Sequence, residues 1–239
     1  MKNPIKNAMD NSADQSLATS WRRKRFAFFL TLIDRLEAPI RILDVGGTRQ
    51  FWDMMKFIAS EQAQITLLNT CPVEISGRHM QSVVGDARDM PQFADREFDV
   101  VFSNSVIEHV GTREDQRRMA DEIRRVGKCY FVQTPNRGFP IEPHFMFPFF
   151  QFLPVPCRAK LLQKFNLGWF ARVPDYESAK LSVQAIRLLT RQDLEQMFPE
   201  AEIFEERVLG LTKSFVAYSG WWKSRPGKDI SPAGTSKVI

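Results

Sequence analysis

The amino-acid sequence predicts an α/β protein built on a mostly parallel sheet of about seven strands. Short β-branched and aliphatic runs alternate with amphipathic helical segments through residues 38–135, a pattern typical of β-α-β units. Several of these runs end in glycine or small polar residues, as strands do where a parallel sheet meets a ligand. Two further runs near the C-terminus are spaced to pair as an antiparallel hairpin.

The composition is that of an ordinary globular domain, with 44% hydrophobic and 26% charged residues among 239. Much of the net charge of +5 lies in Arg22–Arg25 and in the C-terminal tail, so no nucleic-acid-binding surface is indicated. The three cysteines are too widely spaced for a disulfide framework or a zinc site. We therefore expect no metal and a reducing, cytoplasmic location, which the polar first 20 residues also favour.

The N-terminal part is expected to be a flexible segment followed by one helix. Residues 1–19 are rich in Asn, Ser, Asp and Ala, and from Trp21 to Leu36 apolar residues recur at helical spacing until Pro39 ends the pattern. The favoured interpretation is a helix packed on the sheet edge or over a ligand. The alternative is peripheral membrane contact through Arg22–Arg25 and the neighbouring phenylalanines.

The motif on which the chain is organised is a strand over residues 40–45 that ends in Gly46 and Gly47. Glycine lets the backbone approach a ligand closely, and the helix that begins near Thr48 directs free N–H groups toward it. Asp44, at the strand end, can accept hydrogen bonds from the turn or from a cationic ligand. By itself the motif is equally compatible with a plain strand exit.

Four more strands are expected, at residues 65–69, 81–87, 98–105 and 128–133, with helices over 51–58 and 112–126. Thr112 and Asp115 form a capping box at the start of the second helix. Because the carboxyl ends of parallel strands meet at one edge of a sheet, the polar residues there should converge on one crevice.

The stretch after the fifth strand differs from the rest of the chain in amino-acid composition. Eight of the chain's 20 phenylalanines lie between Phe139 and Phe170, interleaved with prolines that prevent one continuous helix. We expect a compact lid insertion over residues 135–176, folded over the open end of the sheet. Its phenylalanines either form an aromatic pocket, which we favour for the insertion as a whole, or only a separate small core.

The last part of the chain completes the predicted domain, which spans residues 20–219. Thr190 and Asp193 form a capping box for a helix through Met197, and residues 202–208 and 214–218 read as the terminal hairpin. Residues 220–239, rich in proline and glycine, are expected to be a flexible tail.

Taken together, the strand exits resemble the class I S-adenosylmethionine-dependent methyltransferases over roughly residues 38–219. The blocks that carry the resemblance are residues 42–47, 85–91 and 98–110. The third block, with its Glu-His pair, is most similar to the small-molecule and lipid methyltransferase branch. The resemblance implies a Rossmann-like methyltransferase sheet and S-adenosyl-L-methionine as the cofactor.

The resemblance also implies the cofactor ligands. Asp44 would oppose the ammonium group of the cofactor, Asp86 would take the adenine amino group, and Asn69 stands where the family usually has a carboxylate that grips both ribose hydroxyls. Since an amide is a weaker acceptor than a carboxylate, we expect Asp in place of Asn69 to bind the cofactor more tightly. The full implied set is Asp44, Gly46, Gly47, Asn69, Asp86, Ala87, Ser103 and Asn104.

Candidate catalytic residues are His144, Glu142 and His109. His79 lies at the expected far end of the sheet and is set aside. His109 follows Glu108 at a helix start near the cleft and by resemblance supports the cleft wall more often than it acts as a base. His144 lies among aromatic residues next to Glu142, which suits a general base, although a structural histidine in a proline-rich turn is an equal alternative.

We therefore predict a methyltransferase acting on a bulky, largely apolar small-molecule acceptor. A nicotinamide dehydrogenase would need Gly-x-Gly-x-x-Gly, and that spacing is absent after Asp44. The alternative is a catalytically degenerate methyltransferase-like binding protein, which Asn69 supports, and a membrane-surface adaptor is a third possibility. The sequence leaves open the oligomeric state and whether oxygen, nitrogen or carbon is methylated.

Overall fold

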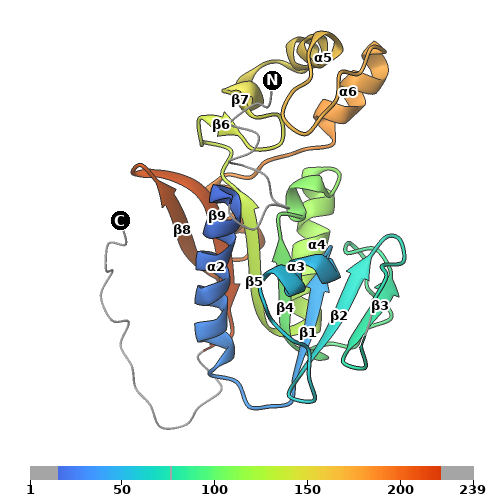
Figure 1. The fold of residues 1–239 in the computed structure, drawn as a ribbon, viewed down its shortest axis with the longest axis vertical. Coiled ribbons are helices and arrows are strands. Elements are labelled where there is room, and N and C mark those ends of the chain that lie inside the picture. The colour runs from blue at the N-terminus through green and yellow to red at the C-terminus, as the bar shows by residue number, and fades with distance from the viewer. Residues whose placement is uncertain (1–15, 76, 222–239) are drawn as a thin grey trace.

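The structure is a computed structural model that describes residues 16–75 and 77–221. Most of the predicted flexible N-terminus and of the predicted tail lies outside the described residues. The described part forms one seven-stranded sheet with the strand order β3-β2-β1-β4-β5-β9-β8 and helices on both faces (Figure 1). The predicted fold class is thus confirmed.

The sheet is parallel from β3 to β5, and only its last two strands are antiparallel. Because β1 pairs with β2 on one side and with β4 on the other, the strand order reverses there and opens a crevice at the carboxyl ends of β1 and β4. The strands are β1 (Ile40–Val45), β2 (Ala63–Asn69), β3 (Met80–Val84), β4 (Phe98–Asn104), β5 (Gly127–Pro135), β8 (Glu202–Val208) and β9 (Leu211–Ser219).

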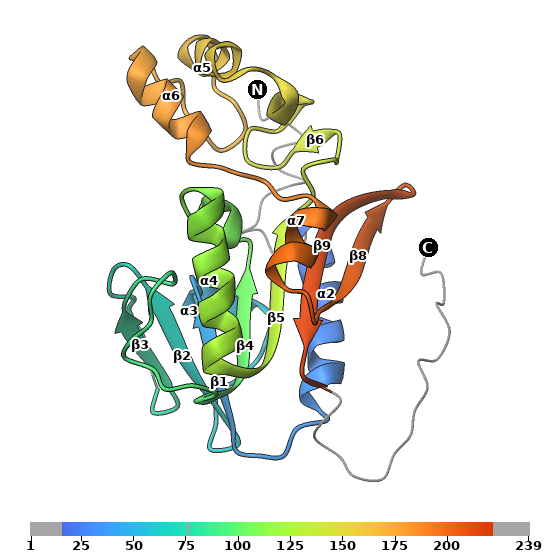
Figure 2. The ribbon, with the colours of Figure 1, turned by 180° about the vertical axis from the view of Figure 1, so that it is seen from behind.

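Two helices cover each face of the sheet (Figures 1 and 2). On one face lie α2 (Leu17–Ile33) and α3 (Arg49–Met54), and on the other lie α4 (Arg113–Val126) and α7 (Arg191–Met197). Both predicted capping boxes are present at the starts of α4 and α7, where each threonine and the acid three residues later satisfy one another's backbone N–H groups. Each face therefore has its own core between helices and sheet.

The N-terminal helix packs on the sheet, as the favoured interpretation expected, but it begins at Leu17 rather than near Trp21. Phe26 and Phe29 are buried against the sheet, and Arg25 is only 6% exposed and forms an ion pair of 3.0 Å with Glu206. Of the residues on which the membrane interpretation depended, Arg25, Phe26 and Phe29 thus face inward, whereas Arg23 and Lys24 are exposed. Within the described part, no helix combines the length and apolar character needed to cross a bilayer.

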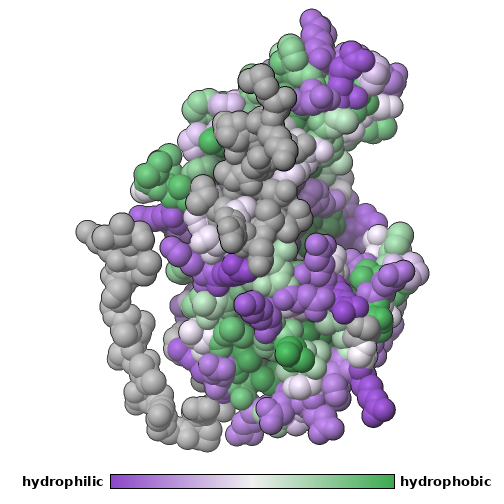
Figure 3. Space-filling model, viewed as in Figure 1, coloured by the Kyte–Doolittle hydropathy of each residue, from purple (hydrophilic) through white to green (hydrophobic). Residues whose placement is uncertain are grey.

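The surface of this face is divided into two zones. Figure 3 shows apolar side chains gathered over its lower half, while strongly hydrophilic side chains lie above them, nearer the carboxyl ends of the strands. On this face, hydrophilic side chains therefore lie between the apolar patch and the carboxyl ends of the strands.

The phenylalanine-rich stretch forms a separate small unit beyond the carboxyl ends of the strands (Figure 1). It contains the hairpin β6 (Ile141–Glu142) and β7 (Phe147–Pro148), followed by α5 (Val155–Lys164) and α6 (Tyr176–Gln184). Phe145 and Phe150 lie in its own core with ring centroids 4.3 Å apart. We call residues 136–190 the upper unit; it extends past the predicted boundary at residue 176 because α6 adds Ala179 and Val183 to its core.

The ordered chain also continues beyond residue 219. Trp221 is 2% exposed, and its indole N–H donates a hydrogen bond of 3.2 Å to the carbonyl of Tyr130. Gly220 makes the turn with φ of +91°, and a Cβ there would lie 2.4 Å from the carbonyl oxygen of Lys128. The first two residues of the predicted tail, Gly220 and Trp221, therefore belong to the folded domain. Nothing in the local sequence indicates that this tryptophan packs on β5.

Candidate functional site

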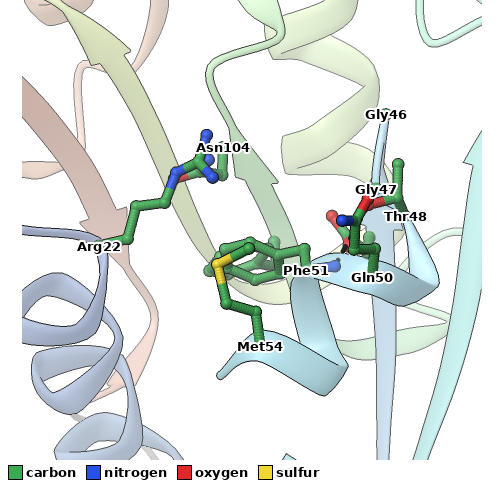
Figure 4. A pocket seen from close by; sticks show the side chains of 10 residues that line it. Arg22, Gly46, Gly47, Thr48, Gln50, Phe51, Met54 and Asn104 are labelled. Carbon is green, nitrogen blue, oxygen red and sulfur yellow. Dashed lines mark hydrogen bonds between the residues drawn. The ribbon is translucent and has the colours of Figure 1, made fainter. Parts of the chain in front are cut away.

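A cavity of about 280 Å³ lies at the carboxyl ends of β1 and β4 (Figure 4). Four of the predicted cofactor residues line it, namely Asp44, Gly46, Gly47 and Asn104. The sequence analysis did not predict its other lining residues, which are Arg22, Thr48, Gln50, Phe51, Met54 and Phe102. The glycine turn therefore opens onto a cavity, as expected, and α2 and α3 supply the walls opposite it.

Asp44 is the central polar group of this cavity. Its carboxylate is 1% exposed, and its Oδ2 atom accepts a hydrogen bond of 2.7 Å from the indole N–H of Trp52. Burial raises the pKa of Asp44 to about 8, and the bond from Trp52 offsets only part of that rise. A Cβ at Gly47 would lie 1.7 Å from Oδ2, so the carboxylate can rest against the turn only because residue 47 is glycine.

The other four predicted cofactor residues do not line this cavity. Asn69 donates from Nδ2 to the carbonyl of Gly47 at 2.9 Å, and so it holds the glycine turn in place. Ser103 is buried and donates to the carbonyl of Val45 at 3.3 Å. The side chains of both residues are used to hold backbone at the strand exits.

Asp86 and Ala87 follow β3 at the same edge of the sheet. The carboxylate of Asp86 forms an ion pair of 2.6 Å with Arg88, and this hydrogen-bonded partner holds the pKa of Asp86 below its usual range. Arg88 also reaches Asp115 of α4 at 3.1 Å. A ligand that used the Asp86 carboxylate would share it with Arg88.

Two arginines from α2 reach the exit of β4. Figure 4 shows Arg22 extending from α2 over the cavity toward Asn104. Arg25 donates to the side-chain carbonyl of Asn104 and holds Glu206 at the same time. Burial, and then the charge of Arg25, lowers the pKa of Arg22 to about 10. In the sequence, Arg22 and Arg25 stand about one helical turn before Phe26 and Phe29, which places them on the same side of α2. The sequence did not indicate that this side of the helix faces the sheet.

The three candidate catalytic residues come together although they lie in two distant segments. His144 Nδ1 is 2.7 Å from Glu142 Oε1, and His144 Nε2 is 3.1 Å from His109 Nε2. Glu142 is 2% exposed, and its Oε2 atom accepts the backbone N–H groups of His144 and Phe145. Glu142 is therefore fixed, and it fixes the His144 ring in turn.

Glu108 adds a fourth titratable group that the sequence analysis did not include among the site residues. Its side chain is completely buried; Oε2 accepts a hydrogen bond of 3.0 Å from Thr134, while Oε1 has no partner among the described residues. Burial raises the pKa of Glu108 to about 7, even though the charge of His144 acts in the opposite direction. Because Glu108 directly precedes His109 in the sequence, this position could have been used to predict that Glu108 belongs to the site.

The pKa values of the two histidines are shifted in opposite directions. Burial, and then the charge of His144, lowers the pKa of His109 to about 4. Burial also lowers the pKa of His144, but the hydrogen bond and charge of Glu142 outweigh it, so the pKa of His144 is raised. The ligand atoms of Glu108, His109 and His144 all lie within 4.8 Å of one another, so this cluster could also hold a metal ion.

Comparisons with known proteins agree with the fold. A family described as "Methyltransferase domain" matches residues 43–129. Two uncharacterized proteins of Mycobacterium tuberculosis, from strains CDC 1551 and H37Rv, are 35% identical over 65 residues, which is 27% of this chain. The chain covers only 22% of the length of these curated relatives.

Solved structures of similar fold include SAM-dependent methyltransferases from two organisms. The protein from Methanosarcina mazei is 14% identical with a TM-score of 0.48, covering 79% of this chain and 95% of that one. The protein from Aquifex aeolicus is 10% identical with a TM-score of 0.45, covering 90% of this chain and 92% of that one.

The sheet order and the glycine turn at the β1–β4 crevice define a Rossmann-like α/β fold that binds a nucleotide-containing cofactor. The methyltransferase-domain match begins at Leu43 in β1 and ends at Cys129 in β5, so the part of the chain that carries this turn is similar to the methyltransferase family. The cofactor implied by this family is S-adenosylmethionine.

The residues of the cavity fit that cofactor. Asp44 is a buried carboxylate that accepts a hydrogen bond from a neutral indole, so an ammonium group would supply the missing positive charge. The Asp44 carboxylate lies so close to Gly47 that a side chain at residue 47 would collide with it. Asp44, Gly46, Gly47 and Asn104 would hold the amino-acid part of S-adenosylmethionine.

Proposed function

We propose that this protein transfers the methyl group of S-adenosylmethionine to a small-molecule acceptor, bulky and largely apolar, that binds beneath the upper unit. The observation that carries the proposal is the buried Asp44 carboxylate resting on the Gly46-Gly47 turn at the strand-order reversal. The cofactor supplies an electrophilic methyl group on a sulfonium centre. The protein contributes alignment of the two reactants and exclusion of water.

The upper unit supports this assignment of the acceptor. It lies beyond the carboxyl ends of the strands, on the side toward which the β1 and β4 exits open (Figure 1). Phe145 and Phe150 belong to its own core, whereas Phe149, Phe152 and Trp169 keep large exposed fractions of 56%, 52% and 41%. Some aromatic residues of the upper unit therefore form its core, and others lie on its surface, where an apolar acceptor would pack.

The Glu142–His144–His109 group is placed to handle a proton of the acceptor. With Nδ1–H donated to Glu142, the Nε2 atom of His144 carries a lone pair that faces His109 at 3.1 Å. An acceptor hydroxyl that replaced His109 at this lone pair would pass its proton to His144 as its oxygen bonds to the methyl carbon. The bound cofactor would supply the methyl group and would keep the electron pair of its carbon–sulfur bond as S-adenosylhomocysteine.

The cofactor part of the proposal is tested by titrating purified protein with S-adenosylhomocysteine in a calorimeter. We expect saturable binding, weakened at least about tenfold in Asp44→Ala because a charged contact is lost. The matched control is Asp53→Ala, which removes an exposed acid from α3 next to the cavity and should bind like the wild type. Absence of heat in the wild type, or equal binding by Asp44→Ala, contradicts the proposal.

A second experiment separates an enzyme from a degenerate binding protein. Labelled S-adenosylmethionine is incubated with the protein and a small-molecule extract, and transfer of label into extractable products is measured. Binding without any transfer favours the degenerate alternative, for which the use of Asn69 to hold the Gly47 carbonyl, away from the cavity, is the supporting observation.

A further inference from the structure

A second cavity, of about 380 Å³, lies where the upper unit meets the start of α4. It shares no lining residue with the cavity at Asp44. Four arginines from four different segments line it: Arg113 at the start of α4, Arg137 after β5, Arg158 in α5 and Arg187 after α6. A convergence of four guanidinium groups on one cavity requires a counter-charge, because each repels the others.

Only one of the four arginines is neutralised within the described part of the chain. Arg113 forms an ion pair of 2.9 Å with Asp193. Arg187 has a single weak side-chain contact, from Nε to the carbonyl of Gly111 at 3.3 Å. Burial lowers the pKa of Arg113, and the charges of Arg137 and Arg187 lower it further despite Asp193, which shows that the three guanidinium groups act on one another.

Arg158 and Arg137 have free donors. The Nε atom of Arg158 is buried without a hydrogen-bond partner among the described residues, while its Nη1 donates to the carbonyl of Val183 at 3.3 Å. The guanidinium of Arg137 has no hydrogen bond or ion pair to any residue that the structure describes. A buried N–H of a charged group left unpaired is costly, so these donors indicate a ligand rather than a finished protein contact.

The carboxylate in the cavity wall provides only part of the counter-charge: the charge of Glu142 raises the pKa of Arg158, but burial lowers that pKa by more. Glu142 lines the cavity, but Oε1 is bound to the His144 ring at 2.7 Å and Oε2 accepts two backbone N–H groups. The rest of the wall contains two amides, Gln151 and Gln184, and the apolar residues Phe145, Phe150, Val155, Val183, Ile186 and Leu188. The cavity thus combines a strongly basic part with an aromatic and aliphatic part.

The cavity is joined to the histidine group on two sides. Glu142 belongs to both, and the backbone N–H of Arg187 donates to the carbonyl of Glu108 at 2.7 Å. A molecule whose charged end lies among the arginines therefore has its remaining part next to Glu142 and the β4 exit. This is the side of the cavity on which His109 and His144 meet.

We propose that this second cavity binds the anionic group of the methyl acceptor, a phosphate or carboxylate carried on an apolar body. The proposal rests on the proposed methyl transfer and narrows its substrate class from largely apolar to amphiphilic and anionic. The arginines hold the charged group by charge-assisted hydrogen bonds, and Phe145 and Phe150 pack on the adjoining apolar part.

Three probes of one shape test the proposal: phenyl phosphate, benzoate and phenol, with inorganic phosphate as the reference. Binding to the purified full chain is measured by calorimetry with and without saturating S-adenosylhomocysteine. We expect phenyl phosphate and benzoate to bind at least about tenfold more tightly than phenol, since a charged hydrogen bond is worth roughly 1.5–3 kcal/mol. Phenyl phosphate should also exceed inorganic phosphate.

The variants are Arg158→Gln and Arg137→Gln, with Arg172→Gln as the matched control. Arg172 is an exposed arginine of the same upper unit and does not line the cavity. Its substitution therefore removes one positive charge without changing the proposed site. We expect both cavity variants to bind phenyl phosphate at least about tenfold more weakly and the control to bind it normally. Binding of S-adenosylhomocysteine should remain unchanged in all three, which verifies that each variant is folded.

The possible results divide clearly. Equal binding of phenyl phosphate by the wild type, Arg137→Gln and Arg158→Gln overturns the anion site. Binding of inorganic phosphate as tight as that of phenyl phosphate overturns the acceptor assignment and leaves a site for a free anion. If the proposed methyl transfer fails instead, S-adenosylhomocysteine does not bind while phenyl phosphate still does.

Discussion

The two cavities of this protein are built in opposite ways. The glycine turn and Asp44 of the first come from one continuous stretch, β1 and its exit, and their neighbours in space are mostly neighbours in sequence. The second takes one arginine from each of four segments between α4 and α7, and no two of them are adjacent in the chain. The glycine turn of the first cavity is encoded by one short stretch of sequence, whereas the second cavity, our proposed acceptor site, is assembled by the packing of the upper unit.

The difference extends to charge. In the first cavity the unbalanced group is a buried carboxylate, and in the second it is a set of guanidinium groups. A cationic ligand part therefore suits the first, and an anionic one suits the second. The five predictions that follow probe this contrast, beginning with the largest expected effect.

The largest effect concerns the pH dependence of stability that Asp44 imposes. Its pKa is about 8 in the folded protein against an ordinary value of 3.8, so between these two values the folded state keeps a proton that the unfolded chain has lost. The free energy of unfolding should therefore fall as the pH rises from about 4 to about 8, by an amount on the order of several kcal/mol, and level off above.

Asp44→Asn removes this titration. Urea unfolding of both proteins at several pH values should give a difference that grows steadily in favour of the variant as the pH rises. A constant difference over this range would show that Asp44 is ionised in the folded protein at low pH, and a cationic partner for it would then have to exist.

The next effect concerns turnover at the histidine group. His144→Ala should lower methyl transfer by a factor on the order of 10² to 10⁴, because a positioned base is lost, while S-adenosylhomocysteine affinity is retained. Transfer of label into an extract is the measurement, and His79→Ala, which changes the loop before β3, is the control. Loss of both transfer and affinity would mean that the upper unit has collapsed, and full activity would remove His144 from the mechanism.

Gly47→Ala should weaken cofactor binding by about tenfold to a hundredfold. The new methyl group would coincide with the Asp44 carboxylate, which must turn away from the cavity and from Trp52. Calorimetry with S-adenosylhomocysteine measures the change. Gly138→Ala, where the nearest atom to a Cβ lies at 3.3 Å, is the control and should bind normally. Normal binding by Gly47→Ala would show that the turn is not in contact with the cofactor.

The agreement between sequence and structure follows the same division. The strands, both capping boxes and the turn at Asp44 were predicted, because periodicity, threonine–acid spacing and glycine pairs act over a few residues. The sequence also named His109 and His144 separately. It could not show that their rings meet across 35 positions, since that depends on how the β6–β7 hairpin leaves β5.

The features that the sequence analysis did not predict have one physical cause in common. Arg158 and Arg187 looked like ordinary surface residues of helices and loops, because charge at one position carries no sign of the other charges it will face. Trp221 was assigned to a tail because the glycine and proline residues around it dominate the local composition. In each case a long-range contact decided the outcome.

A metal titration sharpens the assignment of the histidine group. Zn²⁺ and a proton compete for the same Nε2 lone pairs of His109 and His144, so Zn²⁺ should bind and inhibit methyl transfer. Glu142→Gln should weaken Zn²⁺ binding by about tenfold to a hundredfold, because the carboxylate orients the His144 ring. Calorimetry with Zn²⁺ measures this, with Glu177→Gln on exposed α6 as control. Activation by Zn²⁺ would instead make the ion a part of the mechanism.

The smallest effect is expected at Asn69, and it is opposite in sign to the expectation from the sequence. The amide Nδ2 donates to the Gly47 carbonyl at 2.9 Å, and an aspartate cannot donate there. Asn69→Asp should therefore loosen the glycine turn and weaken S-adenosylhomocysteine binding a fewfold, in line with the loss of one hydrogen bond of about 1 kcal/mol.

Asn69→Ala separates the two causes within that effect, since it removes the donor without adding a charge. We expect Ala to weaken binding and Asp to weaken it further, because a carboxylate would face the Gly47 carbonyl oxygen. If Asp instead tightens binding while Ala weakens it, residue 69 contacts the ribose hydroxyls of the bound cofactor. The hydrogen bond to Gly47 would then be one that the cofactor displaces.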